Sequence, residues 1–354
     1  MSLHAIDDIG DAIDATKSLL LPFAARTWLK LAVVVFFIGG GGGGFNGLQN
    51  AGNFGGQDQP TDGGAGQPVF DGGAPTTVDG VMSAISPELL VILGVVFLLV
   101  LVFGLLSNFM EFVFVESLVS REVHIRRYLR ENVGNALRLF GFRLVVSLVS
   151  LLLVVGFLYT VFVTAFGGNF DNVTTTALFS VLPVAIAFFV VLGILQGLIT
   201  GFTTVFVVPM MLTGDRGVVG SWKRLLGSMR RNVKQYLAYL AFSIVLGIGV
   251  GIISSIASVI ATLLLAIPFV LLGAVAWFGL GGGTIALALL AIAVVAFVLV
   301  LLLATTLIQV PLQAFLRYYA MLVLGDIEEP LDPLPEVRAD IRPDEPDGAA
   351  SEPI

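Results

Sequence analysis

The residues with the clearest potential for chemistry are two carboxylates within an apolar stretch. Glu111 and Glu116 lie near the end of the run from Leu89 to Val115. An acidic side chain deep in a membrane span is costly to bury, so it is a candidate for handling a proton or a substrate. We favour a simpler interpretation, in which these acids lie at the membrane interface and pair with Arg121 or another cation beside them.

Other polar side chains also interrupt the apolar stretches. Gln196 and Gln309 each occur inside a long apolar run, accompanied by the threonine pairs Thr203-Thr204 and Thr305-Thr306. Such groups usually form hydrogen bonds between helices, and a substrate path is the less favoured interpretation. The candidate intramembrane polar site comprises Glu111, Glu116, Gln196 and Gln309.

The sequence contains no recognisable catalytic or metal-binding motif. Its two histidines, His4 and His124, are far apart, and it has no cysteine. The glycine run from Gly39 to Gly44 is followed by Phe45 rather than by the Lys-Ser/Thr of a phosphate loop. We therefore predict that the protein is not an enzyme and binds no metal or other cofactor.

The most distinctive segment is the basic stretch from Val218 to Tyr236. Its apolar residues recur at helical spacing, and cations fill the remaining surface. Such a helix can lie in the membrane interface with its cations among lipid headgroups. The alternative is that these cations only fix the topology. Nucleic-acid binding is not predicted, because no aromatic platform accompanies the charge. The candidate headgroup contacts are Lys223, Arg224, Arg230, Arg231 and Lys234.

Composition places the chain among membrane proteins. Apolar residues make up 57% of the 354 positions and charged residues 12%, and the mean hydropathy is +0.99. Soluble domains are about one quarter charged. All lysines and arginines fall in four blocks, which by the positive-inside rule lie in the cytoplasm. The blocks are Lys17–Lys30, Arg121–Arg143, Arg216–Lys234 and Arg317–Arg342.

The apolar tracts between these blocks predict an all-α, polytopic transmembrane helical bundle in the cell membrane. Six spans would return both termini to the cytoplasm. They cover about 28–45, 89–115, 142–166 and 178–212, with two more within 237–316. The last tract is long enough for three spans, but a third would place Arg317 outside. We favour two spans plus a re-entrant or interfacial piece around Pro268–Trp277. Whether residues 259–283 form that piece or a seventh span stays open.

Two segments differ from this pattern. Residues 46–87 are polar and rich in glycine, which predicts a flexible outer loop. Residues 326–354 are acidic and rich in proline, which predicts a disordered cytoplasmic tail. Residues 1–325 then form a single transmembrane domain. Asn172, in an Asn-x-Thr pattern in another outer loop, is a candidate glycosylation site.

Internal similarity indicates three parallel repeats. Thr203 to Pro209 matches Thr305 to Pro311, and Lys17-Ser-Leu-Leu aligns with Lys223-Arg-Leu-Leu. Each unit would contain an inner amphipathic helix, an outward span and a returning span, over about 1–116, 117–213 and 214–325. Because parallel repeats differ from the inverted pairs of many carriers, they weigh mildly against alternating access.

Small residues recur four apart in two of the spans. They are Gly193, Gly197 and Gly201 in one, and Gly247, Gly251 and Ser255 in another. Rows of small residues let helix backbones approach closely in lipid.

Three stretches carry a family resemblance: ATKSLLLPFAARTWLKLAVVVFF at the start, FVFVESLVSREV, and VVPMMLTGDRGVVGSWKRLLGSMRRNVKQY. On these the chain resembles a family of uncharacterised multi-pass membrane proteins of halophilic archaea. The excess of arginine over lysine and the sequence pI near 4.8 fit that origin. A more distant likeness is to membrane domains found with glycerophosphodiester phosphodiesterases. It implies membrane architecture only, since their catalytic domain is absent.

Two functions remain open. The first is a non-enzymatic integral membrane scaffold or accessory protein, whose partners are membrane lipids and other membrane proteins. The alternative is a transporter or permease for a small or amphipathic solute. A polar cavity holding Glu111, Gln196 and Gln309 would favour transport, and a tightly packed interior would favour the scaffold.

Overall fold

The computed structural model describes residues 4–40, 86–169, 174–214, 217–279 and 281–342, and these residues form helices without any strand. Five helices in this part are long and apolar enough to cross a membrane. The predicted all-α polytopic bundle is confirmed. The five are α5 (Pro87–Ser120), α7 (Val133–Phe166), α8 (Thr175–Phe202), α11 (Val233–Gly279) and α12 (Thr284–Ile327).

Shorter helices connect and cover them. The helix α8 continues through a π-helical turn, η3 (Thr203–Val207), into α9 (Val208–Thr213). Two further short helices, α6 (Ile125–Glu131) and α10 (Val218–Arg231), precede α7 and α11. The chain therefore repeats the order of a short helix, an outgoing helix and a returning helix.

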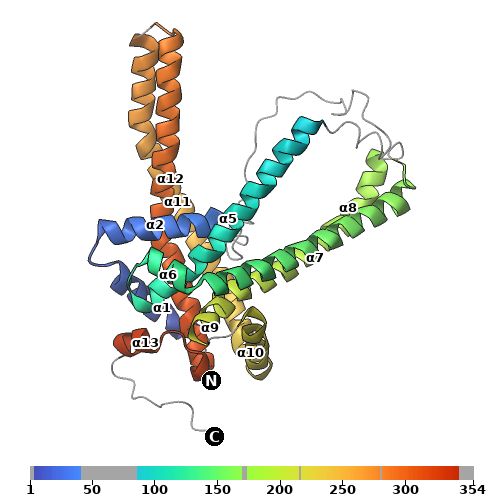
Figure 1. Ribbon diagram of the computed structural model, residues 1–354, viewed down its shortest axis with the longest axis vertical. Helices are drawn as coiled ribbons and strands as arrows, with labels where there is room; N and C mark the ends of the chain where they lie inside the picture. Colours follow the sequence, from blue (N-terminus) through green and yellow to red (C-terminus); the bar gives the residue numbers. More distant parts are fainter. Residues whose placement is uncertain (1–3, 41–85, 170–173, 215–216, 280, 343–354) are drawn as a thin grey trace.

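The first predicted span has an unexpected form. The helices α1 (His4–Leu20) and α2 (Ala25–Gly40) meet at a bend of 119° and would count as a sixth span only if taken together. With 16 residues, α2 alone falls short of the ~20 that cross a bilayer. Figure 1 shows it lying across α5 and α12. Residues 41–45 of the predicted span lie outside the described residues.

The two ends of the described chain lie together. The last described residue, Arg342, bonds Asp8 of α1 at 2.7 Å from Nη2 to Oδ1. We call this the basal end of the molecule. The helices α5, α8 and α12 run toward it, whereas α7 and α11 run away from it (Figure 1).

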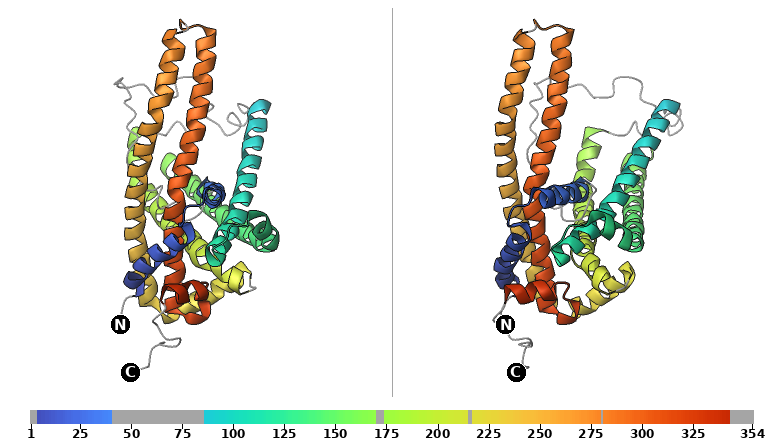
Figure 2. Two further views of the ribbon diagram at one scale, coloured as in Figure 1. Left: turned by 90° about the vertical axis from the view of Figure 1, so that its left-hand side faces the viewer. Right: turned by 60° about the vertical axis from the view of Figure 1, so that its left-hand side comes forward.

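The structure corrects the prediction for residues 259–283. No re-entrant or interfacial piece forms around Pro268–Trp277, because α11 continues unbroken for 47 residues, with Pro268 inside it. In lipid, a helix satisfies its own backbone groups, so a single proline is tolerated more easily than an open loop. The chain reverses at Gly281 and Gly282, whose φ angles of 70° and 72° favour glycine. Figure 2 shows α11 and α12 rising together beyond the other helices.

The buried core lies at the basal end rather than along the long helices. Its largest side chains include Phe112 of α5, Phe206 of η3 and Tyr318 of α12. The most apolar windows of the five long helices are only 0–6% buried. Away from the core, α5 and the α7–α8 pair diverge from the α11–α12 hairpin (Figures 1 and 2). Basal packing thus holds the helices together.

The predicted disordered tail is wrong for residues 326–342. This segment, which we call the C-terminal clasp, contains η4 (Glu329–Leu331) and α13 (Pro335–Ile341). Three apolar side chains of the clasp, Leu331, Leu334 and Val337, are buried. Its acidic composition suggested disorder, but distant cations neutralise the carboxylates. Residues 343–354 lie outside the described part.

Ion pairs hold the clasp to three parts of the chain. Arg342 bonds Asp8 and Asp11 of α1, with Nε to Asp11 Oδ2 at 2.6 Å, and also contacts Asp326. Burial raises the pKa of Asp332 to about 6, so desolvation offsets part of what its bond to Arg338 contributes. The other links are Arg121 to Asp340 at 2.7 Å, Arg231 to Glu328 at 2.8 Å, and Arg224 to the carbonyl of Pro330 at 3.0 Å.

The clasp predicts a specific loss of stability. We expect Arg342→Ala to lower the free energy of unfolding by about 2 kcal/mol, because it removes the shared partner of Asp8, Asp11 and Asp326. Chemical unfolding in detergent micelles measures this. The control is Arg127→Ala, whose pair with Glu131 is largely exposed to solvent and should contribute far less to stability. Equal losses in the two variants would contradict the role of the clasp.

Candidate functional site

A buried ion pair joins α5 to α12. Glu111 is fully buried and Arg317 is 6% exposed. The guanidinium of Arg317 donates from Nη2 to Glu111 Oε1 and from Nη1 to the carbonyl oxygen of Thr204. The sequence singled out Glu111, but its partner is Arg317 rather than Arg121, which bonds Asp340 instead.

A second arginine enters the same place from α7. Arg143 donates from Nη1 to Asn108 Oδ1 at 2.9 Å and from Nη2 to Thr204 Oγ1 at 2.6 Å. Thr204 therefore bridges the two guanidinium groups, one through its hydroxyl and the other through its carbonyl. We call these five residues the Arg–Glu cluster: Asn108, Glu111, Arg143, Thr204 and Arg317.

The π-helical turn η3 positions Thr204. All five of its residues are buried, and its hydrogen bond from Val208 N–H to Thr203 O spans five residues instead of four. The helix is wider here, and π-helical turns often occur at functional sites. The neighbouring Thr203 accepts a hydrogen bond at 3.1 Å from the indole N–H of Trp222 on α10. The turn is thus fixed by α7, α10 and α12 together.

The cluster holds more positive than negative charge. It contains two arginines, which stay charged in proteins, and one glutamate. Two of its buried atoms, Glu111 Oε2 and Arg143 Nε, have no hydrogen-bond partner among the described residues. A buried polar atom in this state marks a place where a ligand, an ion or water completes the bonding. The cluster can hold an anion, but it lacks a nucleophile and base in contact.

The other predicted polar residues lie elsewhere. Glu116 is nearer the end of α5 and accepts a hydrogen bond at 2.5 Å from Asn132 Nδ2. On α12, Gln309 donates to Ser254 Oγ of α11 at 2.7 Å, which is the helix–helix bond expected of such a residue. Within the described structure, no hydrogen bond joins Gln196, Gln309 or Glu116 to the Arg–Glu cluster.

The basic helix α10 divides its cations between two roles. Arg224 and Arg231 bond the C-terminal clasp. The side chains of Lys223 and Arg230, and of Lys234 at the start of α11, are exposed and form no ion pair with any described residue. These three remain candidates for lipid headgroups. Asn172, the predicted glycosylation site, lies outside the described residues.

Sequence reasoning missed three members of the cluster, Asn108, Arg143 and Arg317, and noted Thr204 only as part of a threonine pair. Arg143 is the last cation before a basic-free tract, and Arg317 is the first cation after one. Because both arginines border an apolar tract, this position is the signal from which a buried partner for Glu111 could have been predicted.

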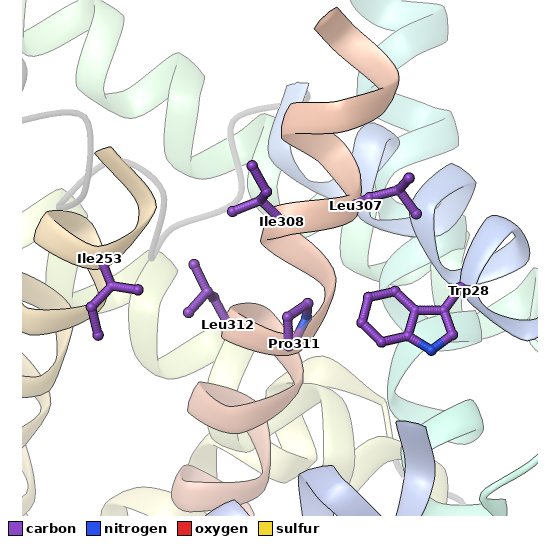
Figure 3. Close-up of a pocket in the computed structure, with 6 residues that line it drawn as sticks. All are labelled: Trp28, Ile253, Leu307, Ile308, Pro311 and Leu312. Atoms are coloured by element: carbon purple, nitrogen blue, oxygen red, sulfur yellow. The ribbon is translucent and has the colours of Figure 1, made fainter. Parts of the chain in front are cut away.

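The two principal cavities do not contain the cluster. An apolar groove of about 390 Å³ lies between α2, α11 and α12, and Figure 3 shows the ring of Trp28 facing Pro311 across it. A smaller cavity of about 170 Å³ at the basal end is lined in part by Ser221, Arg224 and Asp332. The described residues hold no group of three or more His, Asp or Glu side chains that could bind a metal ion.

Comparison with known proteins identifies a family. The model of a family of unknown function, DUF7544, matches residues 3–334. No curated protein and no solved structure matches the chain. The resemblance to membrane proteins of halophilic archaea, the more distant likeness to phosphodiesterase membrane domains and the three repeats remain predictions.

The Arg–Glu cluster predicts a coupled effect on stability. We expect Glu111→Gln or Arg317→Gln alone to lower the free energy of unfolding by about 3–5 kcal/mol, because each leaves a buried charge without its partner. The double variant should lose less than the sum of the two. Thermal and chemical unfolding in detergent measure both. The control is Glu122→Gln at an exposed site, and additive losses would contradict direct pairing.

Proposed function

Because the chain belongs to the DUF7544 family, whose members have no assigned function, we propose a role from its own surface: a non-enzymatic integral membrane protein that acts as a scaffold or accessory for other membrane components or lipids. The main support is the unpartnered apolar surface of its long helices. The most apolar window of α8 is 0% buried within the chain, and that of α11 only 6%.

The rows of small residues support the same proposal. A Cβ atom added at Gly193, Gly197 or Gly201 of α8, or at Gly251 of α11, would meet no atom within 4 Å. These rows are therefore not used for packing inside the chain. In lipid, they suit the close approach of a helix from another protein.

Transport is less well supported. A carrier needs a polar path, but Glu111 is packed in the basal core and Gln309 bonds Ser254. The large groove between α2, α11 and α12 is lined by apolar side chains and Trp28. The proposed role requires no catalytic group, no cofactor and no nucleic acid.

The proposed location is the cell membrane of a halophilic archaeon, with both termini in the cytoplasm. The support is the sidedness of charge. The cations of α6, α10 and α13 lie at the basal end, together with α1 (Figure 1). Basic residues flank spans on the cytoplasmic side. The order of short, outgoing and returning helices also fits the three proposed repeats.

This topology predicts the labelling of single cysteines, for which the cysteine-free chain is a clean background. Glu88→Cys, at the distal end of α5, should react with an impermeant maleimide in intact cells. Lys223→Cys, on α10, should react only after the membrane is permeabilised. Labelling with the opposite sidedness would refute the proposed orientation.

The scaffold role predicts loss of partners without loss of stability. We expect Gly197→Leu to reduce the proteins or lipids that co-purify from native membranes in polymer nanodiscs, because the side chain would fill the row of small residues. Its melting temperature should not change, since the added atoms meet open space.

Gly156→Leu is the matched control. Gly156 also has open space around it but lies on α7, outside both rows. This variant should retain the same co-purifying molecules as the unmodified chain. If the unmodified chain returns no reproducible partner or lipid, the scaffold role is wrong.

A further inference from the structure

We propose that the Arg–Glu cluster is a binding site for one phosphate group, carried by an anionic phospholipid of the leaflet nearest the basal end, with Arg143 as its main contact. This inference goes beyond the scaffold role and holds whether or not the protein has protein partners. It needs only that the long helices cross a membrane.

The first argument is charge. Two guanidinium groups, on Arg143 and Arg317, face one carboxylate, on Glu111, and that carboxylate bonds Arg317. Both terminal nitrogens of Arg143 bond neutral oxygens, on Asn108 and Thr204. An arginine does not shed its proton, and a buried charge without a counter-ion is costly. The cluster therefore lacks one negative charge.

The second argument is an unused donor. Arg143 Nε is buried and has no hydrogen-bond partner among the described residues. A water molecule would satisfy this nitrogen but would not neutralise the charge. An anion does both, and a guanidinium suits phosphate oxygens in geometry and charge.

The third argument is depth. Arg143 lies about 23 residues before the distal end of α7 at Phe166, and Glu111 lies about 23 residues after the exposed Glu88 near the distal end of α5. At 1.5 Å per residue each separation is about 35 Å. A hydrocarbon core is about 30 Å thick, with headgroups beyond it. Measured along the helix axes, both side chains thus lie about one bilayer core away from the distal ends, on the basal side of α5 and α7.

The fourth argument is access. Although its Nε is buried, Arg143 as a whole is only partly buried. The next residues along α7, Leu144 and Val145, are exposed apolar side chains. Arg143 therefore stands where the lipid-facing surface of α7 meets the core. In the proposed complex, a phosphodiester enters from this side while its apolar tails lie along α7.

The experiment measures lipid retention by native mass spectrometry and melting temperature in detergent. The purified full chain is tested with phosphatidylglycerol, with phosphatidylcholine and with inorganic phosphate. We expect one phosphatidylglycerol to remain per chain after weaker lipids are stripped, and the melting temperature to rise. Arg143→Gln should bind it about tenfold more weakly, since the variant removes the charged guanidinium that contacts the phosphate.

Two further variants separate binding from folding. Arg126→Gln removes an exposed cation of α6 outside the cluster and should retain the lipid. Asn108→Asp supplies an internal carboxylate at the position that now bonds Arg143 at 2.9 Å. It should fold and melt at or above the temperature of the unmodified chain without lipid, because it supplies the missing counter-ion, yet gain no stability from phosphatidylglycerol. A purely structural arginine does not predict this loss of lipid response.

Three results would overturn the proposal. They are the absence of a retained anionic lipid on the unmodified chain, unchanged retention in Arg143→Gln, and an undiminished lipid response in Asn108→Asp. Equal protection by inorganic phosphate would rule out the lipid as the source of the phosphate. Because purified protein is used, none of these results depends on whether a protein partner exists.

Discussion

The structure depends on the pairing of Glu111 with Arg317 in a core that excludes water. Neither side chain is tolerable there alone, because burying an isolated charge costs far more than a surface substitution. The pair joins α5 to α12, and Thr204 extends the bonding to Arg143 on α7. The basal parts of α5, α7 and α12 are therefore held together at this cluster. The π-helical turn at Thr203–Val207 is the local distortion that brings Thr204 between the two arginines.

The molecule has two regions with different chemistry, and this ion pair lies in the basal one. At the basal end, apolar packing and the C-terminal clasp form a core that resembles that of a soluble protein, with Arg342 connecting α1 to α12. Away from it, the helices expose apolar side chains on nearly every face. Such surface is stable only against lipid or another protein. The basal region buries its apolar side chains within the chain, whereas the distal helices depend on what surrounds them.

The proposed scaffold role uses the exposed distal helices, whereas the proposed phosphate site lies in the basal region. The open space beside Gly193, Gly197 and Gly201 of α8 and beside Gly251 of α11 suits a neighbouring helix, and the Arg–Glu cluster lies in the basal core. A lipid held at Arg143 would supply the charge that the chain itself lacks, and would make the packing of α5, α7 and α12 sensitive to membrane composition. The membrane would thus complete the basal core as well as cover the helices.

The sequence by itself determined the membrane class, the all-α architecture and the approximate place of the long helices. These follow from local properties, since about 20 apolar residues between blocks of cations must form a helix in lipid. It also identified Glu111 as unusual, because a carboxylate in an apolar run stands out without any partner.

Only the tertiary structure decided which cation faces Glu111, because the partner lies 206 residues away and no local spacing encodes that contact. The C-terminal clasp was missed for the same reason. Its carboxylates suggested disorder, and only the folded structure shows that Arg338, Arg342 and distant arginines neutralise them. The unbroken course of α11 through Pro268 was likewise settled by its packing against α12 along the hairpin, which a count of apolar residues cannot show.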